Sequence, residues 1–338
     1  MWRDLKDSLR HLPKELITTS ETDQRIDLHH SGGSIEIHST HYPDNLRGAG
    51  LDFVILDEAA FMEKGVWSQI VRPMLATSRG SAMFLSTPYG RNWFWEMVRI
   101  GYDAEEPEWR AFHFKTADNP NIAPEEIESI KRETPERIFQ EEYMAQFHSD
   151  AGRVFRGLSA VATAPSNAQP IAGHRYIAGV DWGLDNDYTA IAIIDATTNH
   201  MVALDRFREI GWELQRGRIQ ALHDKWQLTT IWAESNSIGT VNIEALQASG
   251  LPVRAFYTSA KSKRPLIEGL SLAIERQQVA LLNDPVLLHE LASYSMERLL
   301  SGGWRYSAPA GGHDDTVIAT ALAWHGILYG NTIRVDFA

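Results

Sequence analysis

The chain contains no cysteine among its 338 residues. Disulfides, thiolate metal sites and cysteine nucleophiles are therefore excluded, and catalysis would have to use carboxylates, histidine, serine, lysine or a bound metal. Long apolar runs are also missing, since no stretch approaches the roughly 18 consecutive apolar residues of a membrane helix. The first residues, MWRDLKDSLRHLPKE, do not have the pattern of a secretory signal. We therefore expect a cytosolic protein with no membrane partner.

Basic residues are in the minority, and the formal net charge is −12. The excess of acid is uneven: residues 1–150 hold 16 Lys and Arg against 26 Asp and Glu, whereas residues 151–338 hold 16 against 18. The charge of the whole chain therefore says little about nucleic-acid binding. With 43% hydrophobic residues, a chain of this length is expected to form about two globular domains.

The composition predicts a domain at residues 1–150, a linker at 151–174 and a second domain at 175–338. The segment GLSAVATAPSNAQPIAGH within the linker is rich in Ala, Ser, Pro and Gly and shows no sustained period. In the first domain, SIEIHS alternates like an edge strand, while FVILDEAAFM and AMFLSTP are short apolar runs followed by helical patterns. These features predict an incomplete α/β sheet.

The second domain is predicted to be a mixed sheet with helices on both faces, because strands come first and then alternate with helices. We expect strands at 176–181, 189–195 and 201–207, a helix at 212–226, a strand at TTIWAES, a short helix near 241–249, strands at VRAFYT and QVALL between further helices, and a last helix at about 314–329.

Four acids of the second domain follow or precede these elements in a way that suggests a metal site. Asp181 ends the first strand, Glu234 ends a later strand, and Asp314 and Asp315 open the last helix. If the first strand is central, these side chains can converge, and such a cluster repels itself unless cations neutralise it. Two Mg²⁺ or Mn²⁺ ions held by shared carboxylates would support phosphodiester hydrolysis.

Simpler structural roles exist for several of these residues. Asp314 or Asp315 alone is a good helix N-cap. Asp187 is a candidate metal ligand, but it can equally serve the turn in which it lies. His313 can support a metal ligand or can be an ordinary exposed loop histidine.

Basic residues near the start of a helix are the best candidates for DNA contact. The cluster SAKSKRP contains Lys261, Lys263 and Arg264, and it can either bind phosphates or form a solvated loop. Setting aside the four acids of the predicted metal site leaves 16 basic residues against 14 acidic ones in 151–338.

The first domain carries a second set of candidate residues. LDFVILDEAAFM is an apolar strand that ends in Asp57 and Glu58, an arrangement in which the first acid holds the Mg²⁺ shell of a nucleotide and the second polarises water. Ser86 and Thr87 follow the next strand and are candidates for sensing a γ-phosphate. The alternative is a turn between strand and helix with a capping hydroxyl.

The phosphate-binding loop G-x-x-x-x-G-K-[ST] is absent from the sequence. HSGGSIEIHS contains glycines, but it lacks the Lys and precedes a strand instead of a helix. We therefore expect ATP to bind poorly unless a P-loop is supplied from elsewhere.

Taken together and in order, the motifs resemble those of the large subunit of a tailed-bacteriophage terminase, the DNA-packaging ATPase and nuclease. The resemblance covers nearly the whole chain. It rests on LRGAGLDFVILDEAAFM (Walker B), FLSTPYGRNWFW (coupling motif), the helical stretch KTADNPNIAPEEIESIKRETPERIFQEEYMAQF, and three acidic motifs, GVDWGLDNDYTAIAIID, IWAESNSIG and GGHDDTVIATALA.

The resemblance implies a partial P-loop-type ATPase sheet followed by a ribonuclease H-like nuclease that cuts concatemeric double-stranded DNA in the bacterial host cytoplasm. It assigns nuclease metal ligands to Asp181, Glu234 and Asp315, with Asp314 beside them. It also assigns nucleotide roles to Asp57 and Glu58, and coupling roles to Ser86 and Thr87.

The resemblance further implies a portal protein and a small terminase subunit as partners. The missing P-loop suggests a truncated fragment, a decayed prophage gene or a split subunit. Two other functions remain open: a catalytically silent remnant that binds DNA or portal, and another ribonuclease H-like nuclease such as a transposase or resolvase.

Overall fold

The computed structural model describes residues 1–48, 50–148, 152–183, 187–236, 239–298 and 304–330. The chain forms two compact units, Met1–Ser86 and Thr87–Ala338. The domain boundaries expected at residues 150 and 174 stay a prediction. Within the described ranges, no helix combines the length and the apolar character that a membrane crossing requires.

The first unit contains two small sheets. β1 (Ile17–Ser20), β2 (Arg25–Leu28) and β3 (Gly33–Glu36) form an antiparallel sheet in that order, while β4 (Phe53–Asp57) and β5 (Ser81–Leu85) pair in parallel. The strand expected in SIEIHS is β3. It belongs to the antiparallel sheet and not to the α/β sheet of β4 and β5, because short turns join it to β2.

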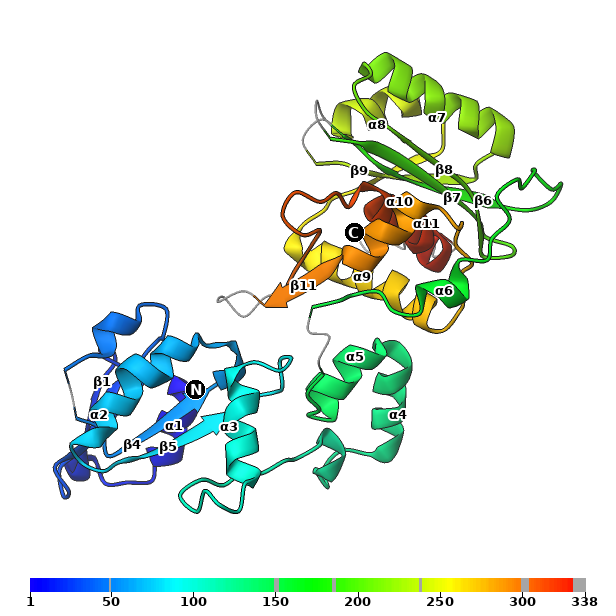
Figure 1. The fold of residues 1–338 in the computed structure, drawn as a ribbon. Helices are drawn as coiled ribbons and strands as arrows, with labels where there is room; N and C mark the ends of the chain where they lie inside the picture. Colours follow the sequence, from blue (N-terminus) through cyan, green and yellow to red (C-terminus); the bar gives the residue numbers. More distant parts are fainter. Residues whose placement is uncertain (49, 149–151, 184–186, 237–238, 299–303, 331–338) are drawn as a thin grey trace. The chain divides into compact units, whose positions relative to one another are not determined.

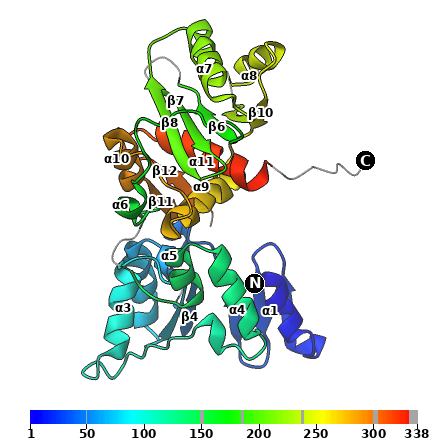
Figure 2. The ribbon, with the colours of Figure 1, turned by 90° about the vertical axis from the view of Figure 1, so that its right-hand side faces the viewer.

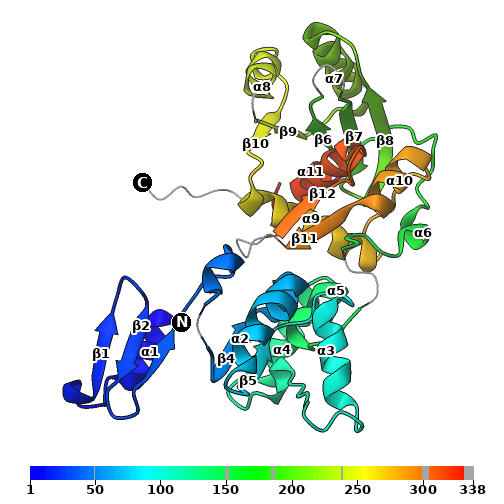
Figure 3. The same cartoon turned by 60° about the vertical axis from the view of Figure 1, so that its left-hand side comes forward.

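Short helices complete the first unit. They are α1 (Trp2–Leu9), η1 (Lys14–Leu16), η2 (Pro43–Leu46), η3 (Ala59–Phe61), η4 (Val66–Val71) and α2 (Arg72–Ala76). Glu21, in the turn after β1, accepts hydrogen bonds from the side chains of Trp2 and Lys6, which ties α1 to this antiparallel sheet (Figure 3).

The second unit contains a five-stranded mixed sheet in the order β10-β9-β6-β7-β8. β6 is central; β7 and β8 continue the sheet antiparallel on one side, and β9 and β10 run parallel to β6 on the other. This confirms the predicted mixed sheet with a central first strand. The strands are β6 (Tyr176–Asp181), β7 (Thr189–Asp195), β8 (His200–Phe207), β9 (Thr230–Glu234) and β10 (Val253–Phe256).

Helices cover both faces of this sheet (Figures 1 and 2). One face packs on α7 (Trp212–Trp226) and α8 (Gly239–Ala248), with Ile219 and Ile243 in the shared core. The other face packs on α9 (Ala260–Glu275), α10 (Pro285–Ser293) and α11 (Asp315–Tyr329). The second unit also contains α3 (Trp93–Tyr102), η5 (Thr116–Asp118), α4 (Pro124–Glu133), α5 (Glu136–Ile138), η6 (Phe139–Tyr143) and α6 (Leu158–Val161).

The last helix, α11, lies directly on the central strand. Gly179 makes this close approach possible, since a Cβ at that position would lie 2.0 Å from the carbonyl oxygen of Ala319 in α11. Residue 179 and its alternate neighbour Asp181 point to the same face of the sheet. Asp181 therefore faces the helix that Asp315 opens.

Two details of the second unit differ from the sequence prediction. QVALL does not form a strand; only Ala280 and Leu282 make isolated bridges, with His200 and Ala164. A short antiparallel hairpin, β11 (Ser295–Arg298) and β12 (Trp304–Ser307), was not predicted. Both segments are too short for a period of two to distinguish a strand from a loop.

Candidate active site

The site is built first on the ends of two neighbouring parallel strands. Asp181 is the last residue of β6 and Glu234 is the last residue of β9. The last paired residues in the register are Val180 and Ala233, so the two acids follow side by side at the same edge. Glu234 makes a side-chain hydrogen bond to Asp181. The predicted convergence of these two acids is confirmed.

The start of α11 brings the other two acids to this edge. Asp314 occupies the N-cap position of α11, yet its side chain makes no capping hydrogen bond. The cap is supplied instead by Glu290 of α10, whose carboxylate accepts hydrogen bonds from the backbone N–H and the hydroxyl of Thr316. The aspartate pair is therefore free from the capping role that was the alternative to a metal site.

Two basic side chains contact the acid pair. Lys263 Nζ lies 3.3 Å from Asp314 Oδ2. Arg206, on β8, lies 3.0 Å from Glu290 Oε1 and 3.5 Å from Asp315 Oδ2. These contacts partly balance the negative charge that the four acids concentrate at one place.

Charge repulsion and burial strongly perturb the acids. Burial, together with the neighbouring carboxylates of Glu234, Asp315 and Asp314, raises the pKa of Asp181 well above its usual range. Burial and the carboxylates of Asp187 and Glu290 raise the pKa of Asp315 to about 8, while Arg206 acts in the opposite direction. Such shifts mark carboxylates that are crowded without enough positive charge.

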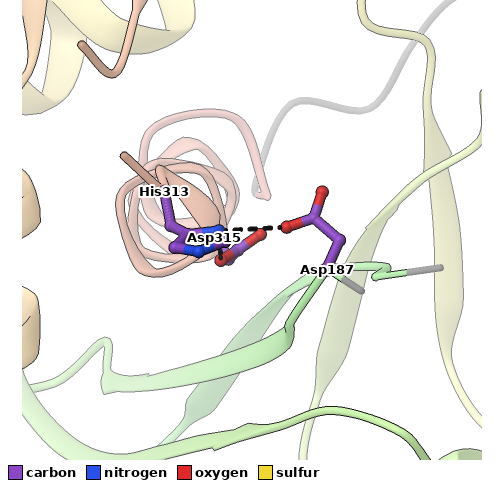
Figure 4. Close-up of side chains that lie close together, drawn as sticks. All are labelled: Asp187, His313 and Asp315. Atoms are coloured by element: carbon purple, nitrogen blue, oxygen red, sulfur yellow. Dashed lines mark hydrogen bonds and ion pairs between the residues drawn. The ribbon is translucent and has the colours of Figure 1, made fainter. Parts of the chain in front are cut away.

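Asp187 and His313 extend the cluster toward solvent (Figure 4). His313 Nδ1 lies 3.3 Å from Asp187 Oδ1 and 3.8 Å from Asp315 Oδ2. One potential ligand atom from each of the three residues lies within 4.8 Å of the others. Asp187 therefore lies beside the site, and not only in the turn before β7.

The donor set fits a divalent cation. Asp315 is 4% exposed, and its Oδ2 atom has no hydrogen-bond partner among the described residues. A buried anionic oxygen in this state is costly unless a cation satisfies it. The surrounding donors are carboxylate oxygens with one imidazole nitrogen, which are ligands that Mg²⁺, Mn²⁺ and similar ions accept.

The candidate DNA-contacting residues lie at the start of α9. Lys263 is engaged by Asp314, and Arg264 forms an ion pair with Glu268 at 2.9 Å between Nε and Oε1. Lys261 is exposed. Of the three, Lys261 is the residue best placed to meet a phosphate, and their role in DNA binding stays a prediction.

The nucleotide candidates of the first unit lie at the ends of β4 and β5. Asp57 ends β4 and is exposed, and Glu58 follows it in the left-handed region with φ 56°. The Ser86 hydroxyl accepts a hydrogen bond from the backbone N–H of Ala60 at 3.1 Å, which is the capping role given as the alternative. Thr87 Oγ1 is buried without a hydrogen-bond partner among the described residues. Roles in binding nucleotide stay predictions.

Arg206 and Glu290 were not identified from the sequence. Arg206 lies in the predicted strand 201–207 and Glu290 in a helix of otherwise apolar character, and neither position has a local motif. A weak signal does exist in the register, because Ala190 pairs with both Asp181 and Arg206. It places Arg206 on the same row and the same face as Asp181, once the strand pairing is known.

A central strand flanked by antiparallel and parallel neighbours, with acids at two strand ends and at the start of the last helix, defines a ribonuclease H-like nuclease fold. Comparison with family models agrees. Residues 6–160 match the N-terminal domain of the T4-like terminase large subunit, and residues 178–325 match the terminase RNaseH-like domain. The chain belongs to the terminase large subunit family. This membership excludes a transposase or a resolvase.

Individual relatives give the same result. The terminase large subunit of Thermus virus P23-45 is 34% identical over 315 residues, which cover 85% of this chain and 64% of that relative. The corresponding protein of Escherichia phage T5 is 25% identical over 316 residues, covering 88% of this chain and 69% of its own. The chain therefore spans about two thirds of the length of the curated relatives it matches.

Solved structures show a similar fold. A large terminase from a thermophilic bacteriophage covers 96% of this chain and 81% of its own, with a TM-score of 0.51 and 13% identity. At that identity, the likeness shows the fold alone. The large terminase nuclease of thermophilic phage G20c, in a crystal structure with bound magnesium, is 30% identical, covers 52% of this chain and 97% of its own and has a TM-score of 0.49.

Proposed function

We propose that this chain is a divalent-metal-dependent endonuclease that hydrolyses the phosphodiester backbone of double-stranded DNA during viral genome packaging. The observation that carries the proposal is the convergence of Asp181, Glu234, Asp314 and Asp315 at one edge of the sheet, with Asp315 Oδ2 buried and lacking a hydrogen-bond partner among the described residues.

The chain's own residues fix the geometry of the reaction. Asp181 and Glu234 are held by paired strands, and Asp315 is held by the first turn of α11, so the ligand oxygens are preorganised on rigid elements. Two Mg²⁺ or Mn²⁺ ions bound there would activate water and stabilise the leaving oxygen. Sequence preference should be weak, because the acids act on the backbone and not on base edges.

Other parts of the terminase function are proposed with less structural support. Asp57, Glu58, Ser86 and Thr87 are proposed to act on a nucleotide only when a P-loop is supplied by another segment or chain, since the sequence contains none. Portal protein and small terminase subunit are proposed as partners on the basis of family membership alone.

The test is cleavage of supercoiled plasmid in the presence of Mn²⁺. We expect Asp181→Asn to reduce the nicking rate by at least about 100-fold, because it removes a charged ligand while keeping the size of the side chain. Asp224→Asn is the matched control: it is the same substitution at an exposed position of α7, on the opposite face of the sheet, and it should leave the rate unchanged.

If the wild-type protein shows no metal-dependent cleavage, the silent remnant that binds DNA or portal becomes the better account. If Asp181→Asn cleaves as fast as the wild type, cleavage does not use this acid cluster.

A further inference from the structure

The cluster of Asp187, His313 and Asp315 is distinct from the pair of acids at the strand ends. Among the candidate ligands that the described residues offer at the site, it contains the only nitrogen donor. His313 Nδ1 faces both carboxylates, at 3.3 Å from Asp187 Oδ1 and 3.8 Å from Asp315 Oδ2 (Figure 4). No role in the proposed reaction has so far been given to His313.

These separations match those of ligands around one small cation. Ligand atoms about 2.1 Å from a divalent ion lie roughly 3 Å apart at a right angle and about 4 Å apart across the ion. The two measured separations lie between these limits. A direct hydrogen bond between an imidazole N–H and a carboxylate would typically be shorter, at about 2.7–2.9 Å.

Two further observations support a prepared ligand position. The buried Oδ2 atom of Asp315, which lacks a hydrogen-bond partner in the described part of the chain, is the carboxylate atom that faces His313. In addition, Tyr188 contacts the His313 ring edge to face, with ring centroids 5.1 Å apart, and the Arg206 guanidinium lies 3.4 Å from the Tyr188 ring centroid. This stack holds the imidazole in its orientation.

We propose that His313 binds one of the two cations directly through Nδ1, with Asp187 and Asp315, so that this position prefers Mn²⁺ over Mg²⁺. Imidazole nitrogen is a poor ligand for Mg²⁺, which strongly prefers oxygen, whereas later divalent metals accept nitrogen readily. The inference rests on the proposed nuclease function and adds the identity of a ligand and a metal preference to it.

The ligand is tested directly by pulsed electron paramagnetic resonance of Mn²⁺ bound to the full chain, which detects a coordinated imidazole nitrogen. We expect nitrogen modulation in the wild type, its loss in His313→Asn, and its retention in His200→Asn. His200 is a matched control because it is exposed and lies at the opposite end of β8 from Arg206.

The metal preference is tested by titrating Mn²⁺ and Mg²⁺ into the wild type and His313→Asp by calorimetry. Replacement of the nitrogen by a carboxylate should lower the ratio of Mn²⁺ to Mg²⁺ affinity by about 10-fold or more and should preserve binding of a cation. This second variant separates loss of the nitrogen from general damage to the site.

Failure of this inference is distinguishable from failure of the proposed function. Bound Mn²⁺ without nitrogen modulation, or modulation that persists in His313→Asn, overturns the role of His313, and the nuclease proposal then depends only on the plasmid assay. If the affinity ratio does not change in His313→Asp, the contact is an ordinary ion pair and the metal preference is wrong. If the wild type binds no Mn²⁺ at all, both proposals fail.

Discussion

At the scale of single residues, the metal-free site is held together by the protein's own cations. Arg206 contacts Glu290 and Asp315, and Lys263 contacts Asp314. Arg206 is the more important of the two basic residues, because Glu290 also caps α11 through Thr316. Removing Arg206 would leave two largely buried carboxylates facing each other without a balancing charge.

We predict that Arg206→Met lowers the free energy of unfolding of the metal-free protein by about 2–4 kcal/mol, since breaking one partner of a buried ion pair is strongly destabilising. Urea unfolding in the presence of EDTA measures this change. Arg218→Met is the control: the Arg218 side chain is 45% exposed against 18% for Arg206, and its pair with Asp205 should contribute about 1 kcal/mol or less. Equal losses in the two variants would contradict the structural role of Arg206.

The ligand acids could be predicted from the sequence, but the residues that support them could not. Asp181 and Glu234 each end an apolar strand, and a polar acid there has a recognisable local pattern. Arg206 and Glu290 act through contacts between a strand and a helix more than 80 positions apart, and no local pattern encodes such a pair. Their roles require the strand register and the packing of α10 on α11.

At the scale of elements, the site depends on how closely α11 packs on β6. A methyl group at residue 179 would lie 2.0 Å from the Ala319 carbonyl oxygen and 2.5 Å from the Ala323 backbone nitrogen. Both atoms belong to the backbone of α11, so the helix would have to move as a whole. Such a movement would carry Asp315 away from Asp181.

We therefore predict that Gly179→Ala destabilises the protein by about 3 kcal/mol or more, because a methyl group is forced into a closely packed interface. Gly217→Ala in α7 is the matched control; nothing lies within 4 Å of its Cβ position, and it should stabilise by about 0.5–1 kcal/mol through helix propensity. Thermal unfolding of both variants decides the matter. A neutral Gly179→Ala would mean that α11 does not lie on β6 as described.

The elements that the sequence predicted best are those with a strong apolar pattern. The strands at 176–181 and 189–195 and the helix at 212–226 have the predicted bounds. QVALL was predicted wrongly because its apolar residues pack as an extended segment without a ladder of hydrogen bonds. Burial gives a segment its apolar character, but it does not decide whether the segment pairs with a neighbouring strand.

At the scale of the whole molecule, the acid cluster links stability to pH and to metal. The pKa of Asp315 is raised from 3.8 to about 8 in the folded chain, and that of Asp181 is raised in the same direction. Between these values the folded state holds a proton that the unfolded state has lost. The contribution of the cluster to stability therefore falls as the pH rises from about 4 to 8 when metal is absent.

We predict that the stabilisation produced by saturating Mn²⁺ increases as the pH rises through this same window, because metal binding requires the deprotonated carboxylates. At a metal concentration about 100 times the Kd, the gain should approach about 2.7 kcal/mol. The thermal unfolding temperature with Mn²⁺ and with EDTA, measured at several pH values, gives the difference.

The control for this linkage is Asp181→Asn, which should show a smaller metal effect at every pH and a weaker increase with pH. A metal effect that is independent of pH in the wild type would mean that Mn²⁺ does not bind at the raised-pKa acids.

The most direct measurement for the whole account is anomalous diffraction from crystals of the protein soaked in Mn²⁺. We predict two peaks about 3.5–4 Å apart, held by carboxylate oxygens of Asp181, Glu234 and Asp315. If the acids bind no manganese, or if the ions lie only at other surface carboxylates, the proposed metal centre and the nuclease function that depends on it are both wrong.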